Sequence, residues 1–236
     1  KKIKFNIPSL TEQKKIVTKL NLAFTEIDKE INLNKKKLLQ INLFNQALLK
    51  SEFNIESEKT QLSNVVDYDK KNSQGSNLPY VGMENISRET MKIVGKINIP
   101  KKTSLTFMFN SSHVLFGRLR PYLRKILLPD FDGQCSTEIF CLKPNERVNK
   151  KFLAYWLLSP IISYQINKAS TGARMPRANM PELLNYQFPI PSLLIQGQIT
   201  KKIDKVFNST DKIKLIIEKK LSNYNSLKSS ILMEEI

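Results

Sequence analysis

The chain contains very few of the residues that usually carry catalysis or covalent cross-links. Among its 236 residues there is one histidine, His113, and there are two cysteines, Cys135 and Cys141. Metal clusters and histidine-based catalytic triads have too few parts with a single histidine. The two cysteines share one apolar stretch, which indicates small core residues in a reducing compartment and not a disulfide framework.

Glycine is also scarce, and no glycine pattern of a cofactor-binding loop is present. The seven glycines are scattered and never form a G-x-G sequence, so the sequence predicts no bound cofactor. Residues 77–80 (Asn-Leu-Pro-Tyr) differ at one position from the Asn-Pro-Pro-Tyr motif of amino-methyltransferases. Pro129-Asp130 followed by Glu138 resembles a nuclease array, but Phe140 stands where that array has lysine. The sequence therefore predicts a protein that is not an enzyme.

Long apolar runs are absent, and no signal peptide is visible, so the sequence predicts a cytoplasmic protein without a membrane partner. The chain does not begin with methionine. It opens on an extended segment from Ile3 to Pro8, which we interpret as the mark of a fragment or a trimmed chain.

Positive charge is abundant. The chain has 38 Lys and Arg against 21 Asp and Glu, for a formal net charge of +17. Such an excess favours a polyanionic partner, most often nucleic acid, because Lys and Arg release condensed counterions from phosphates. A basic protein with no such partner is the alternative. All seven arginines lie between residues 54 and 187, where two clusters occupy residues 117–125 and 170–179. Because Arg makes planar, bidentate contacts, these clusters favour DNA contact over surface salt bridges.

An internal repeat joins the two ends of the chain. Residues 5–53 align without a gap to residues 188–236, with 17 identities in 49 positions. Each copy begins with an Ile-Pro-Ser-Leu sequence followed by Gln13 or Gln196. Ser9 and Glu12 form a capping-box pattern after Pro8 in the first copy, whereas Ile195 replaces the glutamate in the second.

Both copies of the repeat predict a long helix with a heptad seam. In the first copy the predicted seam residues are Leu20, Phe24, Ile27, Ile31, Asn34, Leu38, Ile41, Asn45 and Leu48. In the second copy they are Ile199, Ile203, Val206, Ile213, Ile217, Tyr224, Leu227 and Ile231. Because the chain leaves one helix and returns to start the other, we expect an antiparallel coiled coil. Two unrelated core helices are the alternative.

The segment between the helices predicts an α+β globule with a mixed or antiparallel sheet. Apolar and β-branched residues predict strands at residues 92–97, 113–116 and 125–128, with turns at 72–76 and 129–133. Helices are predicted from Asn149 to Leu158 and from Pro160 to Lys168. The predicted organisation is residues 1–10 as the end of a preceding domain, 11–53 as a long helix, 54–187 as the globule and 188–236 as a second long helix.

The repeated entry to the helices resembles the conserved regions of type I restriction–modification specificity subunits. The globule is similar to their target recognition domains in five pieces that occur in order. These are residues 78–86, 120–125, 135–138, 170–177 and 188–191. In that family two recognition domains alternate with two conserved helices, and this chain has one recognition domain. The resemblance therefore implies a C-terminal half or a half-sized subunit.

The resemblance also implies partners. It predicts a non-catalytic subunit that reads one half of a bipartite target in double-stranded DNA and docks methyltransferase (modification) subunits through its helices. Nuclease or translocase subunits can join such a complex, and a homodimer would restore two recognition domains. Two alternatives remain open. One is a DNA-recognition module of another restriction–methylation enzyme type, and the other is a stand-alone DNA-binding coiled-coil regulator.

Candidate DNA-binding residues follow from the basic clusters and the resemblance. They are Lys70, Lys71, Asn72, Gln74, Arg88, Lys101, Lys102, Arg118, Arg120, Arg124, Lys125, Arg174 and Arg177. Motifs shared by relatives with different targets do not set the target, so Arg120, Arg124, Arg174 and Arg177 are expected to frame the fold or to grip phosphates. Base-reading residues are expected between the motifs. The expected positions are Asp69, Lys70, Lys71, Asn72, Gln74, Arg88 and the segment from Lys101 to Thr106.

Overall fold

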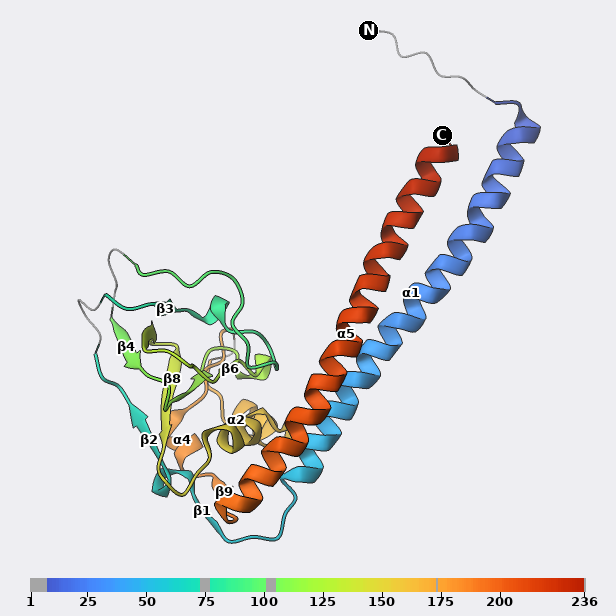
Figure 1. Cartoon of the computed structure of the whole chain (residues 1–236). Coiled ribbons are helices and arrows are strands. Elements are labelled where there is room, and N and C mark those ends of the chain that lie inside the picture. The colour runs from blue at the N-terminus through green and yellow to red at the C-terminus, as the bar shows by residue number, and fades with distance from the viewer. Residues whose placement is uncertain (1–7, 73–76, 101–104, 173, 236) are drawn as a thin grey trace. The chain divides into compact units, whose positions relative to one another are not determined.

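A computed structural model describes residues 8–72, 77–100, 105–172 and 174–235 (Figure 1). The chain divides into two compact units. The first contains residues 1–45 and 206–236, and the second contains residues 46–205. The candidate residues Gln74, Lys101 and Lys102 lie outside the described residues.

The first unit consists mainly of two long helices, α1 (Leu10–Glu52) and α5 (Leu193–Glu235), of which residues 46–52 and 193–205 belong to the second unit. They lie side by side (Figure 1) and run in opposite directions. Asn45 Nδ2 donates to Thr210 Oγ1 over 3.1 Å, and Lys228 Nζ donates to Asp28 Oδ1 over 2.7 Å. Because the earlier residue in α1 contacts the later residue in α5, the predicted antiparallel pair is confirmed.

The predicted seam of α1 is also confirmed. Each of its nine predicted positions is buried or half-buried, and the seam residues Asn34 and Asn45 are only 3% and 8% exposed. The start of α1 has the predicted capping box, in which the Ser9 amide donates to Glu12 Oε2 over 2.9 Å. The hydrogen bonds from the Ser9 hydroxyl and then from the Ser9 amide lower the pKa of Glu12, because both are made with the ionised carboxylate.

The predicted seam of α5 is wrong at two positions. Ile213 and Leu227 are 48% and 47% exposed. The other six predicted positions are buried or half-buried, and the seam also includes Thr210, Lys214, Leu221 and Lys228. The apolar pattern misplaced the seam because polar residues occupy part of it, and Thr210 is held there by its hydrogen bond to Asn45.

The described residues of the second unit form nine short strands in three sheets. The four-stranded sheet has the order β2 (Val66–Asp69), β8 (Ile139–Pro144), β5 (Val114–Gly117) and β6 (Ile126–Leu127). The three-stranded sheet has the order β3 (Tyr80–Val81), β7 (Gly133–Ser136) and β4 (Thr106–Phe109). A two-stranded sheet pairs β1 (Lys59–Gln61) with β9 (Gln187–Pro189). Only β3 and β7 run parallel among these pairs, which confirms a mixed α+β fold.

Three shorter helices complete this unit: α2 (Lys150–Leu158), α3 (Pro160–Lys168) and α4 (Met180–Leu184). The predicted helices at α2 and α3 are confirmed. Asn149 caps α2, since its side chain accepts hydrogen bonds from the amides of Lys151 and Phe152. Every residue of α2 from Phe152 to Leu158 is buried, and Trp156 packs edge-on against Phe188 with ring centroids 5.1 Å apart.

The predicted strand at residues 92–97 is wrong. Ile93 makes a single isolated bridge to Ile86, and Gly95 has φ +72°, which interrupts an extended strand. The side chain of Asn85 instead donates to the carbonyls of Val94 and Lys96. A side chain thus replaces the ladder that a neighbouring strand would have provided.

The core of the second unit lies where the two larger sheets meet. It includes Val81, Leu115, Ile139 and both cysteines, all at 0% exposure. The Cys135 and Cys141 sulfurs are 3.4 Å apart and both thiols are free. The hydrogen bond from Cys141 and the burial of the site raise the pKa of Cys135, so this thiol stays protonated, as the prediction of core cysteines requires.

Candidate nucleic-acid interface

Three loops of the second unit meet at Arg118. The Arg118 amide donates to the Glu138 carbonyl over 2.9 Å, and its carbonyl accepts from the Ala178 amide over 2.8 Å. Two residues further on, the Arg120 amide donates to the Pro176 carbonyl over 2.7 Å. These bonds hold the two arginine clusters of the sequence, residues 117–125 and 170–179, against each other.

Glu138 holds this junction together through its side chain. Arg177 Nε lies 3.0 and 3.1 Å from the two Glu138 carboxylate oxygens, and Arg177 Nη2 lies 2.9 Å from Oε1. Arg118 Nε lies 3.8 Å from the same carboxylate, and its guanidinium lies over the Phe140 ring, 5.3 Å from the centroid. The hydrogen bonds and charge of Glu138 raise the pKa of Arg177. We call Glu138, Arg118 and Arg177 the Glu138 node.

A second ion pair fixes the other end of the 118–125 segment. The Arg124 guanidinium pairs with the Glu89 carboxylate, and the Glu89 amide donates back to the Arg124 carbonyl over 3.2 Å. The backbones of Arg88 and Lys125 form an isolated antiparallel β-bridge next to this ion pair. Lys125 Nζ donates a hydrogen bond to the Met83 carbonyl. Burial, followed by the charge of Arg88, lowers the pKa of Lys125. We call Glu89, Arg124 and Lys125 the Glu89 node.

The backbone at these nodes is strained. Four residues other than glycine have left-handed conformations: Glu89 (φ 60°), Met91 (φ 56°), Arg120 (φ 51°) and Arg124 (φ 46°). Each costs about 1–3 kcal/mol and persists only where surrounding contacts enforce it. In the described residues all four lie in the two segments that the Glu89 node joins, and such strain is concentrated at functional sites.

The predicted residues therefore divide into two groups. Arg118, Arg124, Lys125 and Arg177 are half-buried and engaged in the nodes. Arg88, Arg120 and Arg174 are exposed, and within the described part of the chain no ion pair or hydrogen bond engages their side chains. The fold thus presents three uncommitted guanidinium groups on loops that are fixed by committed ones.

The lysines that follow β2 are connected to the Glu138 node by rings. Lys70 Nζ lies 4.6 Å from the centroid of Tyr68, and the Tyr68 ring packs against Phe140 at 5.2 Å. On the same Phe140 ring lies the Arg118 guanidinium, 5.3 Å from the ring centroid. Burial raises the pKa of Tyr68, and Arg118 opposes the rise. Lys71 and Asn72 continue this segment along β4, where the Met108 amide donates to the Lys71 carbonyl over 2.8 Å.

Four contributors were missed in the sequence. Glu89 and Glu138 hold the nodes, and acidic residues close to arginine-rich segments were the available signal. Tyr122 and Met175 are 50% and 44% exposed beside Arg120 and Arg174. An exposed aromatic residue within an arginine cluster is a frequent contact residue in nucleic-acid sites, so the sequence did carry a signal for Tyr122.

The two near-motifs of catalysis have structural roles. The carbonyls of Leu78 and Pro79 accept hydrogen bonds from Gln134, which fixes β3 to β7. Glu138, from the nuclease-like array, is engaged by Arg177. His113 Nδ1 contacts Asn110, and its Nε2 lies 3.5 Å from Asp69 Oδ2. Among the described residues, no three His, Cys, Asp or Glu side chains gather as metal ligands do.

Comparison with known families assigns the chain. A family profile described as the type I restriction modification DNA specificity domain matches residues 49–223. The chain belongs to this family. The EcoDI specificity subunit of Escherichia coli is 28% identical over 130 residues, which cover 55% of this chain and 29% of that protein. The MjaVIII specificity subunit of Methanocaldococcus jannaschii is 28% identical over 239 residues, which cover 87% of this chain and 56% of that protein.

Solved structures of the family have the same fold. A chain from a structure of the assembly and conformational transition of a type I R-M system matches with a TM-score of 0.77 at 17% identity, over 97% of this chain and 60% of that one. The HsdS subunit from Thermoanaerobacter tengcongensis matches with a TM-score of 0.59, over 97% of this chain and 59% of that chain. The chain thus spans at most about 60% of the length of these relatives. In the described residues, no helix is long and apolar enough to cross a membrane.

Proposed function

We propose that this chain reads DNA sequence for a type I restriction–modification system, in the way that the names of its relatives describe. Residues 54–187 act as the target recognition domain and inspect one half of a bipartite site in double-stranded DNA. Support comes from the family match over residues 49–223 and from the net charge of +17. The chain catalyses no step itself, and it works in the cytoplasm, where its DNA target is.

The observation that carries the proposal is the division of the arginines. The two nodes neutralise Arg118, Arg124 and Arg177 internally, and this fixes the loops that carry Arg88, Arg120 and Arg174. Phosphate contacts set position and base contacts set specificity. Arg120 and Arg174 therefore grip phosphates, while Arg88, Lys70, Lys71, Asn72, Gln74, Lys101 and Lys102 are assigned to base reading.

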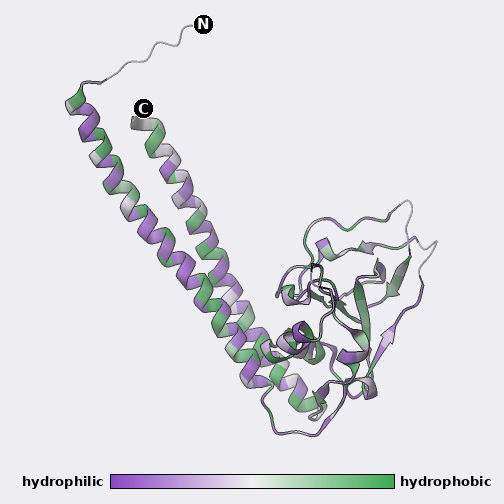
Figure 2. Ribbon diagram, turned by 180° about the vertical axis from the view of Figure 1, so that it is seen from behind, coloured by the Kyte–Doolittle hydropathy of each residue, from purple (hydrophilic) through white to green (hydrophobic). Residues whose placement is uncertain are grey.

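The helices serve as the docking element for methyltransferase subunits, with residues 11–53 and 188–236 as the two conserved regions. Hydrophobic residues recur along both helices (Figure 2), and in the first unit several large ones are exposed. These include Leu22, Leu33, Phe44, Leu215 and Ile216, which are between 41% and 69% exposed. Exposed apolar surface of this kind is typical of a face that another protein covers.

The helix pair has approximate two-fold symmetry, which supports docking of two such subunits. In the internal repeat Asn45 corresponds to Lys228, and Thr210 corresponds to Ile27. A two-fold rotation therefore places the Asn45–Thr210 contact beside the Lys228–Asp28 contact. Two equivalent faces suit two copies of one partner. Pairing of two copies of this chain would supply two recognition domains, and nuclease or translocase subunits join through the same assembly.

Co-expression of the full chain with the methyltransferase of its system tests this function. We expect the two proteins to purify together and to transfer methyl groups to DNA at a split motif with a fixed gap. The chain alone should bind no S-adenosylmethionine in calorimetry. A chain that binds this methyl donor by itself, or one that leaves the methyltransferase behind, contradicts the proposal.

A further inference from the structure

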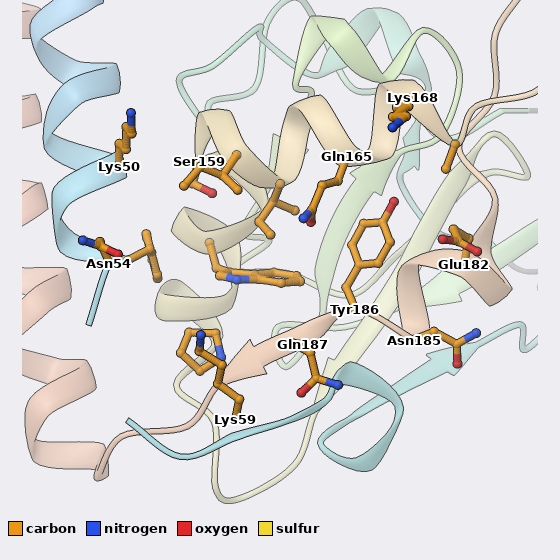
Figure 3. Close-up of a pocket in the computed structure, with 16 residues that line it drawn as sticks. Lys50, Asn54, Lys59, Ser159, Gln165, Lys168, Glu182, Asn185, Tyr186 and Gln187 are labelled. Carbon is orange, nitrogen blue, oxygen red and sulfur yellow. The ribbon is translucent and has the colours of Figure 1, made fainter. Parts of the chain in front are cut away.

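A groove lies on the second unit, and the proposed DNA reading does not use it (Figure 3). Its volume is about 780 Å³, and its lining comes from the end of α1, the segment before β1, α2, α3, α4 and β9. All of these residues belong to the same compact unit. None of them is among the candidate DNA-binding residues.

The floor of the groove is apolar. Trp156, Ile162 and Pro189 line it but are themselves buried, with Trp156 only 2% exposed, and the Trp156 ring packs against Phe188 with centroids 5.1 Å apart. Ile161 stands at the groove with 43% of its surface exposed. Burial of a leucine-sized side chain against exposed apolar surface such as that of Ile161 favours binding.

The walls carry polar side chains that have no partner in the described part of the chain. They include four carboxamides, from Asn54, Gln165, Asn185 and Gln187. Ser159 occupies the N-cap position of α3 and is only 1% exposed. Its hydroxyl nevertheless makes no capping hydrogen bond. This wall contrasts with Arg177 of the Glu138 node, whose guanidinium is engaged by the Glu138 carboxylate.

Positive charge surrounds the groove. Lys50, Lys59 and Lys168 line it and are exposed, and no ion pair engages any of them within the described residues. Glu182 is the acidic residue of the lining. Figure 3 shows Lys50 and Lys59 toward one end and Lys168 and Glu182 toward the other. Burial, followed by the charge of Glu182, raises the pKa of Tyr186, which therefore presents a neutral hydroxyl between them.

We propose that this groove binds an extended acidic peptide segment of a partner protein, with a bulky apolar side chain seated against the exposed Ile161, in the same lining as Trp156. A carboxamide donates and accepts at once, so it pairs with both the N–H and the C=O of a peptide backbone. The lysines pair with carboxylates that flank the apolar side chain. Duplex DNA fits less well, because phosphodiesters offer acceptors only and leave the apolar floor without a contact.

Trp156 makes the proposal measurable, because it is the only tryptophan of the chain. The full chain is titrated with a random copolymer of glutamate and leucine while Trp156 emission is followed. Polyglutamate is the charge control, and a DNA duplex is the non-peptide polyanion. We expect the copolymer to shift the emission and to bind about tenfold more tightly than polyglutamate, since only the copolymer has a side chain for the floor.

Charge-reversed variants locate the binding. Lys50→Glu with Lys168→Glu should weaken copolymer binding by about tenfold. Lys143→Glu is the matched control, because Lys143 is equally exposed on β8 but does not line the groove. All three lysines are on the surface, so unchanged Trp156 emission in the free variants verifies their folding.

The proposal is overturned by any of three results. The first is an emission that does not respond to the copolymer, and the second is equal affinity for polyglutamate and the copolymer. The third is a DNA duplex that produces the same Trp156 shift and is weakened by the same charge reversals, which would make the groove part of the DNA surface. None of these results depends on whether the chain reads a split target.

Discussion

Arginine has two distinct roles in this protein, and single residues illustrate them. The guanidinium of Arg177 binds the Glu138 carboxylate through three contacts of 2.9–3.1 Å. Arg174 lies on the same hairpin, is exposed and has no side-chain partner in the described residues. The first arginine holds the loop in place, and the second is available to a ligand.

Arg174→Ala should weaken binding to every DNA sequence by a similar factor. Loss of one phosphate contact should also reduce the slope of log K against log salt by about one. Fluorescence anisotropy at several salt concentrations measures both quantities, with Lys143→Ala as the control. A loss of affinity confined to one target sequence would show that Arg174 reads a base.

Gly172 determines the shape of the hairpin that carries Arg174. Its φ is +93°, and an added Cβ would lie 3.0 Å from the Met175 carbonyl oxygen. Gly172→Ala should therefore destabilise the protein by about 1–3 kcal/mol and weaken DNA binding, because the hairpin shifts.

Gly197 provides the matched control for this substitution. It lies in α5, and an added Cβ would meet no atom within 4 Å. Gly197→Ala should stabilise the protein by about 0.5–1 kcal/mol, because alanine is the better helix former. Denaturant unfolding measures both variants. If Gly172→Ala is as harmless as Gly197→Ala, the left-handed conformation is not required for the hairpin.

Among the elements, a buried polar contact joins the two long helices and favours one register between them. Asn45 and Thr210 are 8% and 6% exposed and hydrogen-bond each other over 3.1 Å. Such a pair favours one alignment of the helices, because any slip would leave a buried amide without a partner.

Thr210→Val should cost about 1–3 kcal/mol of unfolding free energy, since it leaves the Asn45 amide unpaired. Adding Asn45→Leu should restore much of that stability, because both partners are then apolar. Thr25→Val is the control, as Thr25 is exposed and bonds only to its own helix at Asn21. Denaturant unfolding of the four proteins decides the question. A double variant less stable than Thr210→Val would contradict the role assigned to this pair.

The long helices were predictable from the sequence, but the frame of α5 needed the right signal. Apolar periodicity alone selected Ile213 and Leu227, which are exposed. The internal repeat selects the buried frame, because Thr210, Leu221 and Lys228 correspond to Ile27, Leu38 and Asn45 of α1. A repeat records which face is packed even where polar residues have replaced apolar ones.

The elements of the globule were less predictable because long-range contacts decide them. The apolar residues 92–97 read as a strand, but Gly95 and the Asn85 side chain hold them in a loop. The same holds for the site. The partners of Arg124 and Arg177 are 35 and 39 residues away in sequence, so their engagement follows only from the tertiary fold. The sequence located the arginines but did not separate the committed from the uncommitted ones.

At the scale of the whole molecule, the two units differ in the kinds of surface residue that they carry. The first unit is an antiparallel helix pair with exposed apolar faces, and the second unit carries all seven arginines. Under the proposed function, the second unit can change its DNA target without any change in the helices that we propose to dock partners. This separation predicts that specificity is transferable within the second unit.

The decisive measurement is the selection of bound sequences from a pool of random duplexes by the full chain together with its methyltransferase. It compares the natural protein with one whose residues 66–110 come from a relative that has a different target. We predict that the natural protein enriches one split motif, and that the exchange alters the bases selected in the half-site it reads while the arginine nodes and the helices still support binding. Enrichment of the same motif by both proteins, or of no motif by the natural protein, would contradict the claim that this segment reads the DNA.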